Sequence, residues 1–241
     1  MGSGIYSALS GGLAQMRKME VEVNNLANAG NIGFKGSNLS FESLIDANLQ
    51  NTRGGGKNFC RTAGQFIDFS QGSIKQTGRS LDLAIQGDGF FKVAGEDGFF
   101  YTRQGNFRLD NQGNLVTADG GMQVVGENGP INLPHTDVYI DSQGRITTDD
   151  GEVGKIDLYT TGEKQDLAQM PNGLFDLQEA GAEMPADGSE LVQGGLEQSN
   201  VSALKLATEL IETKRAYAAY MKTMKTYSDL GEKAVSIGQI G

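Results

Sequence analysis

The sequence predicts a mixed fold, in which α-helices at the two ends of the chain pack as a coiled-coil-like pair and enclose an all-β central domain of short antiparallel strands. An apolar stripe near each end and a glycine-rich, turn-rich middle lead to this prediction. The chain divides into an N-terminal helical segment 1–35, an irregular linker or hairpin region 36–78, a central β domain 79–195 and a C-terminal helical segment 196–241.

The N-terminal helix is predicted from residue 4 to about residue 29. Its apolar residues recur at alternating steps of four and three, which places them on one face of a helix in the narrow manner of a coiled coil. Asparagine and glycine between Asn28 and Gly33 then end the helix. The first stripe consists of Ile5, Leu9, Gly12, Met16, Met19, Val23 and Leu26.

The region 36–78 lacks a periodic apolar pattern, so we expect a linker or a hairpin there. The three consecutive glycines 54–56 mark a flexible break within it. Cys60 is the only cysteine, which excludes a disulfide within the chain and a metal cage of several cysteines. We predict that it is an unpaired thiol in a loop.

The central domain is predicted to consist of short strands separated by turns. The runs 90–93 and 99–102 are rich in aromatic residues, and the glycine-containing loop between them predicts a hairpin. A turn of the form Asp-x-Gln-Gly occurs twice, at 110–113 and at 141–144, and each copy is followed by a further strand. Two copies indicate one hairpin turn used twice rather than a repeat array.

The C-terminal helix is predicted to run from Asn200, whose side chain would cap the first turn, to about Leu230. Its stripe has the same spacing as the first one, and neither can stay exposed to water. We expect the two stripes to pack together, in one subunit or between neighbouring subunits. The second stripe consists of Ala203, Leu206, Leu210, Thr213, Tyr217, Tyr220, Met224 and Tyr227. The facing residues would be Leu9, Met16, Val23 and Leu26 on one helix and Leu210, Tyr217 and Met224 on the other.

The formal charge of the chain is −10, and the segment 141–197 is strongly acidic. Such a surface disfavours nucleic acid, whose phosphates bind clustered Lys and Arg. No stretch approaches the roughly 18 apolar residues of a membrane span. No secretory signal is visible either, so we expect the protein to stay in the cytoplasm or to leave by a route that removes no leader.

The residues considered for chemistry do not form a recognisable site. His135 is the only histidine, which excludes a histidine-based triad or multi-histidine metal site within one chain. Gly154-Lys155 lacks the opening glycine and the following hydroxyl residue of a phosphate-binding loop. The segment from Asp110 lacks the closing glutamate of a calcium loop. We predict no enzyme, no cofactor and no metal.

Four strings resemble the bacterial flagellar rod and hook protein family, in the family's order and over nearly the whole chain. Residues 24–35 (NNLANAGNIGFK) are similar to the signature that closes its N-terminal helix, with Asn31 where the family usually has threonine. Residues 81–91 (LDLAIQGDGFF) and 102–107 (TRQGNF) resemble its central β domain. Residues 195–201 (GLEQSNV) resemble the opening of its C-terminal helix, in which Arg215-Ala216-Tyr217 also has a counterpart.

The resemblance implies a structural subunit of the flagellar rod, which assembles helically through its terminal helices and transmits motor torque through the periplasm. Its implied partners are other copies of the chain, neighbouring proximal and distal rod proteins, and the flagellar type III exporter. The resemblance implies no cleaved signal peptide, no cofactor, no nucleic acid and no membrane insertion. The ends of the chain resemble the proximal-rod branch, with the distal-rod branch as the alternative. The implied subunit interface consists of Ile5, Leu9, Met16, Met19, Val23, Leu26, Asn28, Phe34, Leu206, Leu210, Tyr217, Tyr220, Met224 and Tyr227.

Two readings from other functional classes stay open. One is a secreted adhesin or ligand-binding β module, and the other is a glycosidase that uses a pair of the many carboxylates in 141–197. An aromatic content of 7% without tryptophan counts against stacking on sugars. Neither reading explains the helical ends.

Overall fold

The structure is a computed structural model that describes residues 2–45, 58–96, 98–149, 151–162, 166–178, 182–186 and 188–238. The glycines at 54–56 lie outside these residues. The chain forms two compact units. The helical unit comprises Met1–Ala27, Ser37–Phe66 and Ser202–Gly241, and the β unit comprises Asn28–Gly36 and Ile67–Val201.

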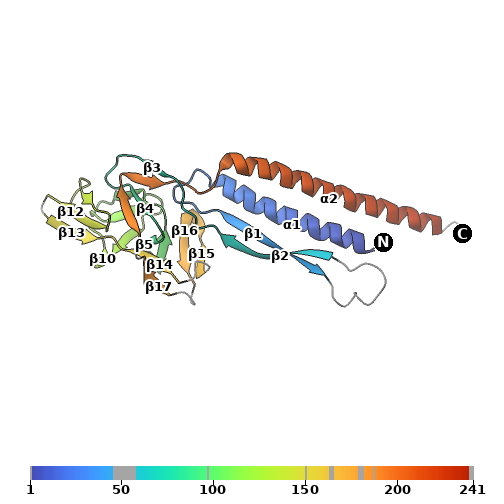
Figure 1. Cartoon of the computed structure of the whole chain (residues 1–241), viewed down its shortest axis with the longest axis horizontal. Helices are drawn as coiled ribbons and strands as arrows, with labels where there is room; N and C mark the ends of the chain where they lie inside the picture. The colour runs from blue at the N-terminus through green and yellow to red at the C-terminus, as the bar shows by residue number, and fades with distance from the viewer. Residues whose placement is uncertain are drawn as a thin grey trace. The chain divides into compact units, whose positions relative to one another are not determined.

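The helical unit is built on an antiparallel pair of helices, α1 (Gly2–Ala27) and α2 (Ala203–Gly238), which lie side by side (Figure 1). The sequence predicted both helices, although α2 continues beyond the predicted end at Leu230. The first turn of α2 is not capped by Asn200, as predicted, but by the Ser202 hydroxyl, which accepts from the Lys205 N–H at 3.5 Å. Asn200 lies two residues before Ser202, and its side chain is held elsewhere in the β unit.

Two further strands, β1 (Ser37–Ile45) and β2 (Asn58–Ile67), form a two-stranded sheet. They lie in the region 36–78, for which the sequence predicted a linker or a hairpin. β1 contacts α1 through Asn25, whose Nδ2 donates to the Ser37 carbonyl at 2.7 Å and whose Oδ1 accepts from the Ser37 N–H at 2.9 Å. Cys60 lies in β2, so its predicted place in a loop is wrong. Pairing with β1 makes this segment a strand, and local sequence does not reveal such pairing.

The β unit contains, among its described residues, one ten-stranded sheet and three smaller sheets. The main path of the large sheet is β15-β16-β6-β5-β9-β8-β7, with β10 beside β9, β14 beside β5 and β17 beside β14. Its strands are β5 (Phe90–Gly95), β6 (Gly98–Thr102), β7 (Phe107–Leu109), β8 (Leu115–Thr117), β9 (Gln123–Gly126), β10 (Gly129–Pro130), β14 (Leu158–Thr161), β15 (Leu167–Gln169), β16 (Leu174–Leu177) and β17 (Glu183–Pro185).

Of the three smaller sheets, one is formed by consecutive strands and two pair segments that are distant in sequence. β11 (Tyr139–Ile140), β12 (Arg145–Thr148) and β13 (Gly151–Lys155) form one sheet, β4 (Leu83–Gln86) pairs with β18 (Glu190–Gln193), and β3 (Ile74–Gln76) pairs with β19 (Gly195–Glu197). These pairings are antiparallel, as predicted for the central domain. The beginning and the end of the β unit are therefore joined through backbone hydrogen bonds.

Strand β5 contributes to both hydrophobic cores, because successive strand residues point to opposite faces. Phe91 and Val93 are fully buried in the larger core. Phe90 lies in the smaller core against Phe175, with ring centroids 5.4 Å apart. Antiparallel pairing of β5 with β6 confirms the hairpin predicted for 90–93 and 99–102.

The two Asp-x-Gln-Gly turns have the same hydrogen bonds, which confirms one hairpin turn used twice. The Asp110 N–H donates to the Asn114 carbonyl, and the Asp141 N–H donates to the Arg145 carbonyl, each at 3.0 Å. The glycines that end the two turns have φ of 83° and 84°, a conformation that favours glycine. The first turn joins β7 to β8 and the second joins β11 to β12.

The aspartate carboxylates close these turns and are stabilised in their charged form. Asn114 Nδ2 donates to Asp110 Oδ2 at 2.9 Å, and this side-chain hydrogen bond is the main cause that lowers the pKa of Asp110 below 3.8. The Arg145 N–H donates to Asp141 Oδ1 at 2.9 Å and is likewise the main cause that lowers the pKa of Asp141.

Replacing both turn aspartates with asparagine is expected to flatten the acid limb of the stability curve. A carboxyl whose pKa is lowered by folding stabilises the fold fully above its ordinary value of 3.8, and this contribution is lost as the pH falls through the folded value. Urea unfolding of the wild type and of the Asp110→Asn/Asp141→Asn variant, from pH 6 to below pH 3, checks this. Asp119→Asn, at an exposed aspartate outside these turns, is the control. Parallel curves for all three proteins would contradict the prediction.

Candidate assembly surface and buried ionic centre

The two helices meet along a face of α1 that is made of small residues. The ring of Tyr220 lies on Gly11, where a Cβ atom would be only 2.5 Å from a ring carbon. The ring of Tyr227 lies in the same way on Gly4, at 2.8 Å. A side chain at either position would displace the tyrosine ring, so glycine is what lets the two rings lie directly on α1.

Farther along the same face, the contact becomes polar. The Thr213 hydroxyl donates to Glu22 Oε1 at 3.0 Å, and Lys18 Nζ lies 3.6 Å from the same oxygen. Both Glu22 and Thr213 are buried. A buried polar pair of this kind fixes the register of two helices more than it stabilises them. The spacing of the inner face gives Gly4, Ala8, Gly11, Gln15, Lys18, Glu22 and Asn25.

The inner face of α1 precedes the predicted apolar stripe by one residue at every step, which is roughly 100° around a helix. Leu9, Met16 and Val23 are 41%, 40% and 49% exposed, so they do not face α2 within the chain, and of the two expected arrangements only packing against a neighbouring subunit stays open for them. The physical reason is the close approach of the tyrosine rings, which turns the glycine-bearing face of α1 toward α2. Ile5, Met19 and Leu26 are half-buried at the margin of that face.

Large apolar side chains remain exposed on the opposite side of α1. We call this set the outer stripe, and it consists of Tyr6, Leu9, Leu13, Met16 and Val23. Its members are between 40% and 57% exposed. Aligned apolar residues on one helix face are typical of protein contact sites.

The predicted stripe of α2 faces α1 for most of its length. Leu206 and Thr213 are buried, and Leu210, Tyr217, Tyr220 and Met224 are half-buried. Ala203 is exposed at the start of the helix, and Tyr227 is 38% exposed despite its contact with Gly4. Asn28 is half-buried, whereas Phe34 is 5% exposed. Phe34 is therefore packed inside its own chain, and its part in a contact between subunits stays a prediction.

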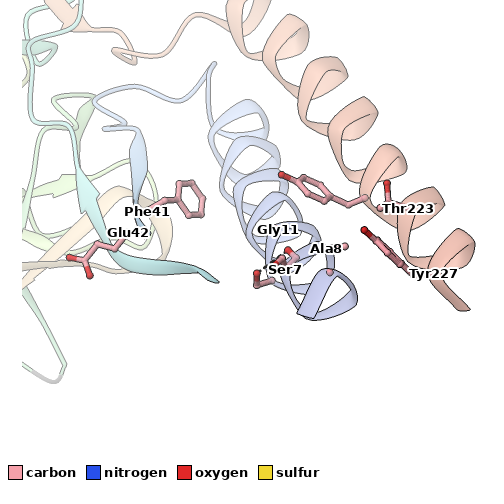
Figure 2. A pocket seen from close by; sticks show the side chains of 10 residues that line it. Ser7, Ala8, Gly11, Phe41, Glu42, Thr223 and Tyr227 are labelled. Atoms are coloured by element: carbon pink, nitrogen blue, oxygen red, sulfur yellow. Dashed lines mark hydrogen bonds between the residues drawn. The ribbon is translucent and has the colours of Figure 1, made fainter. Parts of the chain in front are cut away.

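A groove of about 620 Å³ opens beside the helix pair, within the helical unit. Figure 2 shows Tyr227 reaching from α2 toward the first turns of α1, and Phe41 on β1 at the other side. Glu42 is the charged residue among those that line the groove. The groove is lined by Gly4, Ser7, Ala8, Ser10, Gly11, Phe41, Glu42, Tyr220, Thr223 and Tyr227.

A buried ionic centre lies in the β unit. Lys35 Nζ donates to Glu197 Oε1 at 2.5 Å, and Arg103 Nη1 donates to Glu197 Oε2 at 3.1 Å. The side chains of Lys35 and Glu197 are fully buried, and that of Arg103 is 3% exposed. One carboxylate thus faces two cations away from water, a geometry in which the loss of a partner is costly.

Backbone groups complete the centre. Lys35 Nζ also donates to the Ser70 carbonyl at 2.8 Å, and the Gly72 N–H donates to Glu197 Oε1 at 2.9 Å. Burial lowers the pKa of the Lys35 ammonium, and its hydrogen bond to Glu197 opposes this effect. Burial also lowers the pKa of the Arg103 guanidinium, against the attraction of Glu197. The centre therefore depends on the charge of its single carboxylate.

The ionic centre is the point at which the four strings of the resemblance meet. The first string supplies Lys35, the third supplies Arg103 and the fourth supplies Glu197, while Arg103 Nη2 donates to the carbonyl of Gly87 in the second at 2.8 Å. Sequence reasoning did not single out this centre. A usable signal was present, because these three residues are the single charged residues of their strings.

The residues considered for chemistry have structural surroundings. Gly154-Lys155 lies in β13, whereas a phosphate-binding loop would connect a strand to a helix. His135 is exposed. In the described part of the chain, no three His, Cys, Asp or Glu side chains are grouped to hold a metal ion. Over the same residues, neither helix is long and apolar enough to cross a membrane.

Two family models match the chain. The model described as flagellar hook protein FlgE/F/G D1 domain matches residues 84–153, which lie in the β unit. The model described as flagellar basal body rod FlgEFG protein C-terminal matches residues 192–237, which include most of α2.

Two rod proteins are similar over the full length or nearly so, and a hook protein is similar over about half of the chain. The flagellar basal-body rod protein FlgF of Caulobacter vibrioides is 33% identical, with 100% of both chains covered. The flagellar basal-body rod protein FlgG of Bacillus subtilis is 32% identical, with 97% of this chain and 98% of the relative covered. The flagellar hook protein FlgE of Helicobacter pylori is 38% identical over 47% of this chain, but only 18% of that protein is covered.

Proposed function

The chain belongs to the family of flagellar basal-body rod proteins, and we propose that it is a structural subunit of the rod whose copies are held together by the outer stripe of α1. The observation that supports this is the orientation of α1, which directs its glycine-bearing face toward α2 and its large apolar side chains away from α2. On the side of α1, the contact between the two helices is made by glycine, alanine and polar residues, whereas Leu9, Leu13 and Met16 stay exposed.

The energetics of the helix pair support a role for neighbours. The inner face of α1 carries only glycine, alanine and polar side chains, and isolated helices are marginal without tertiary packing. Apolar surface contributes about 25 cal/mol for each Å² removed from water, so covering the outer stripe in every subunit would add substantially to the assembly. In a single chain, the helix pair therefore has a defined register but a low stability. In the assembly, contacts with neighbouring subunits stabilise it.

The geometry of the stripe supports a coiled-coil contact between copies. From Tyr6 to Met16 its residues follow the alternating steps of three and four that coiled coils require, and Val23 lies a full seven residues after Met16. The stripe and the groove beside Phe41 are different surfaces of one helical unit. A contact between two different surfaces repeats head to tail and builds an open helical assembly when the rotation does not close a ring. The terminal helices thus provide the connecting part of a shaft.

Location and partners follow from the same role. We place the chain in the flagellar basal body, in the part of the rod that spans the periplasm, next to copies of itself and to other rod proteins. Delivery through the flagellar type III exporter accords with a chain that has one cysteine and so no internal disulfide. No catalytic step is needed for this function.

The proximal-rod branch, FlgF, is the member that we favour. The support is the sequence at the two ends, Gly4–Gly11 and Glu232–Val235, which resembles that branch. Identity does not separate the branches, because the FlgF and FlgG relatives match at 33% and 32%. Assignment to FlgG would leave the helix contacts and their role unchanged.

Photo-crosslinking in assembled basal bodies tests the proposal. A benzophenone amino acid placed at Leu13, in the outer stripe, is expected to give products that join the chain to a second copy or to another rod protein. The same group at Gln15, on the inner face, is the matched control and should react within its own chain. The purified, dilute Leu13 variant should give no intermolecular product. A basal body in which position 13 stays uncrosslinked to any neighbour would contradict the proposal.

A further inference from the structure

The chain crosses from one unit to the other at four points, which we call passages. One side chain forms hydrogen bonds that join the residues at three of these passages. The residues concerned are Gly36, at the passage into β1; Asp68, just after β2; and Asn200, just before α2. All three belong to the β unit. They are far apart in sequence, since 132 residues separate Asp68 from Asn200.

The three residues form a closed ring of hydrogen bonds. The Gly36 N–H donates to Asn200 Oδ1 at 2.9 Å, Asn200 Nδ2 donates to the Asp68 carbonyl at 2.7 Å, and the Asp68 N–H donates to the Gly36 carbonyl at 2.8 Å. The Asn200 side chain therefore uses its acceptor on one passage and its donor on another. The third bond connects those two passages directly.

Neighbouring contacts brace the ring. Asn200 Nδ2 also lies 3.2 Å from the Ser70 carbonyl, which accepts from Lys35 of the ionic centre. The Asn200 N–H donates to the Phe34 carbonyl at 3.3 Å. Each passage is thus attached to the buried core of the β unit within two residues of the ring.

We infer that Asn200 is a positioning residue that clasps three passages of the chain into one block. In such a block, force on any one passage is shared by the other two, because displacement of one residue breaks bonds to both others. This mechanical use deepens the proposed function and rests on it. The clasp itself depends only on the contacts above and can be tested in the purified chain.

Site-resolved hydrogen exchange of the full chain tests the clasp. In Asn200→Ala, the Gly36 amide loses its acceptor directly, whereas the Asp68 amide keeps its own acceptor, the Gly36 carbonyl. A clasp requires both amides to exchange at least about tenfold faster, which corresponds to about 1.4 kcal/mol. Acceleration of the Gly36 amide alone would overturn the inference.

Two further variants keep the result interpretable. Asn132→Ala removes a side chain that joins Gln112 to Asn114 elsewhere in the β unit, and it should leave the Gly36 and Asp68 amides unchanged. Asn200→Asp keeps an acceptor for Gly36 but loses the donor to Asp68, and faster Asp68 exchange in it supports the clasp. If Asn200→Ala also accelerates the amides of β5 and β9, the substitution has loosened the whole β unit, and Asn200→Asp becomes the deciding variant. Unchanged exchange of the Asp68 amide in Asn200→Asp would overturn the inference. Swimming of Asn200→Ala in viscous medium tests the mechanical use separately, and normal swimming would overturn that use alone.

Discussion

Cells whose only copy of this chain carries Leu9→Asp are expected not to swim. Leu9 is 41% exposed in the single chain, and the proposed neighbour would bury it. An unpaired carboxylate in an apolar contact costs several kcal/mol, and the same cost recurs in every subunit. The measurement is spreading in soft agar, with export of the variant followed separately so that failed delivery is not mistaken for failed assembly.

Leu210→Asp separates the two surfaces of the helix pair. Leu210 is half-buried on the stripe of α2 that faces α1 in its own chain. Both variants should abolish swimming, but only Leu210→Asp should reduce the helical circular dichroism and thermal stability of the purified chain. Val153→Asp, which introduces the same charge at a residue of the same 41% exposure in the β unit, is the control and should swim. Swimming cells that have incorporated Leu9→Asp would contradict the role of the outer stripe.

Glu197→Gln is expected to produce the largest loss of stability. The substitution keeps the shape of the side chain but leaves Lys35 and Arg103 as buried cations without a counter-charge. Breaking a buried ion pair from one side costs about 3–5 kcal/mol, against a total stability of about 5–15 kcal/mol for a domain. Urea unfolding of the purified chain, followed by tyrosine fluorescence, measures the loss.

Two comparisons identify the cause of that loss. Glu209→Gln removes a carboxylate that lies 3.7 Å from Lys205 Nζ at the surface, and it should cost no more than about 1 kcal/mol. The triple variant Lys35→Met/Arg103→Met/Glu197→Met removes all the buried charges and should recover part of the stability lost in Glu197→Gln. A triple variant less stable than the single one would show that shape, rather than charge, is responsible.

The helices and hairpins could be predicted from sequence because their signals are local. Apolar spacing located α1 and α2, and the paired Asp-x-Gln-Gly turns reappear with the same hydrogen bonds. The partner of each helix face could not be predicted. The spacing that starts at Ile5 and the spacing that starts at Gly4 are identical, so the pattern left open whether the apolar stripe faces the helix of its own chain or a helix of a neighbouring subunit. In a chain that assembles, apolar residues can be kept for a neighbour instead.

The ionic centre and the clasp were beyond local reasoning. Each joins residues that only the complete β unit brings together, such as Lys35 and Glu197, which are 162 residues apart. Asn200 was predicted to cap α2 because asparagine before a helix commonly does so. Its side chain bonds to Gly36 and Asp68 instead, which no nearby residue could reveal.

The ionic centre also imposes an order of events on folding. Glu22 of α1 and Thr213 of α2 are 191 residues apart, so their contact closes a long loop in an unfolded chain. Once Lys35 is bound to Glu197, the connecting path shrinks to roughly 30 residues, and the entropic cost of closure falls by about 2 kcal/mol. The β unit should therefore fold first and the helices should pair last. A chain that reaches its destination unfolded would present its outer stripe to neighbours only after its middle had become compact.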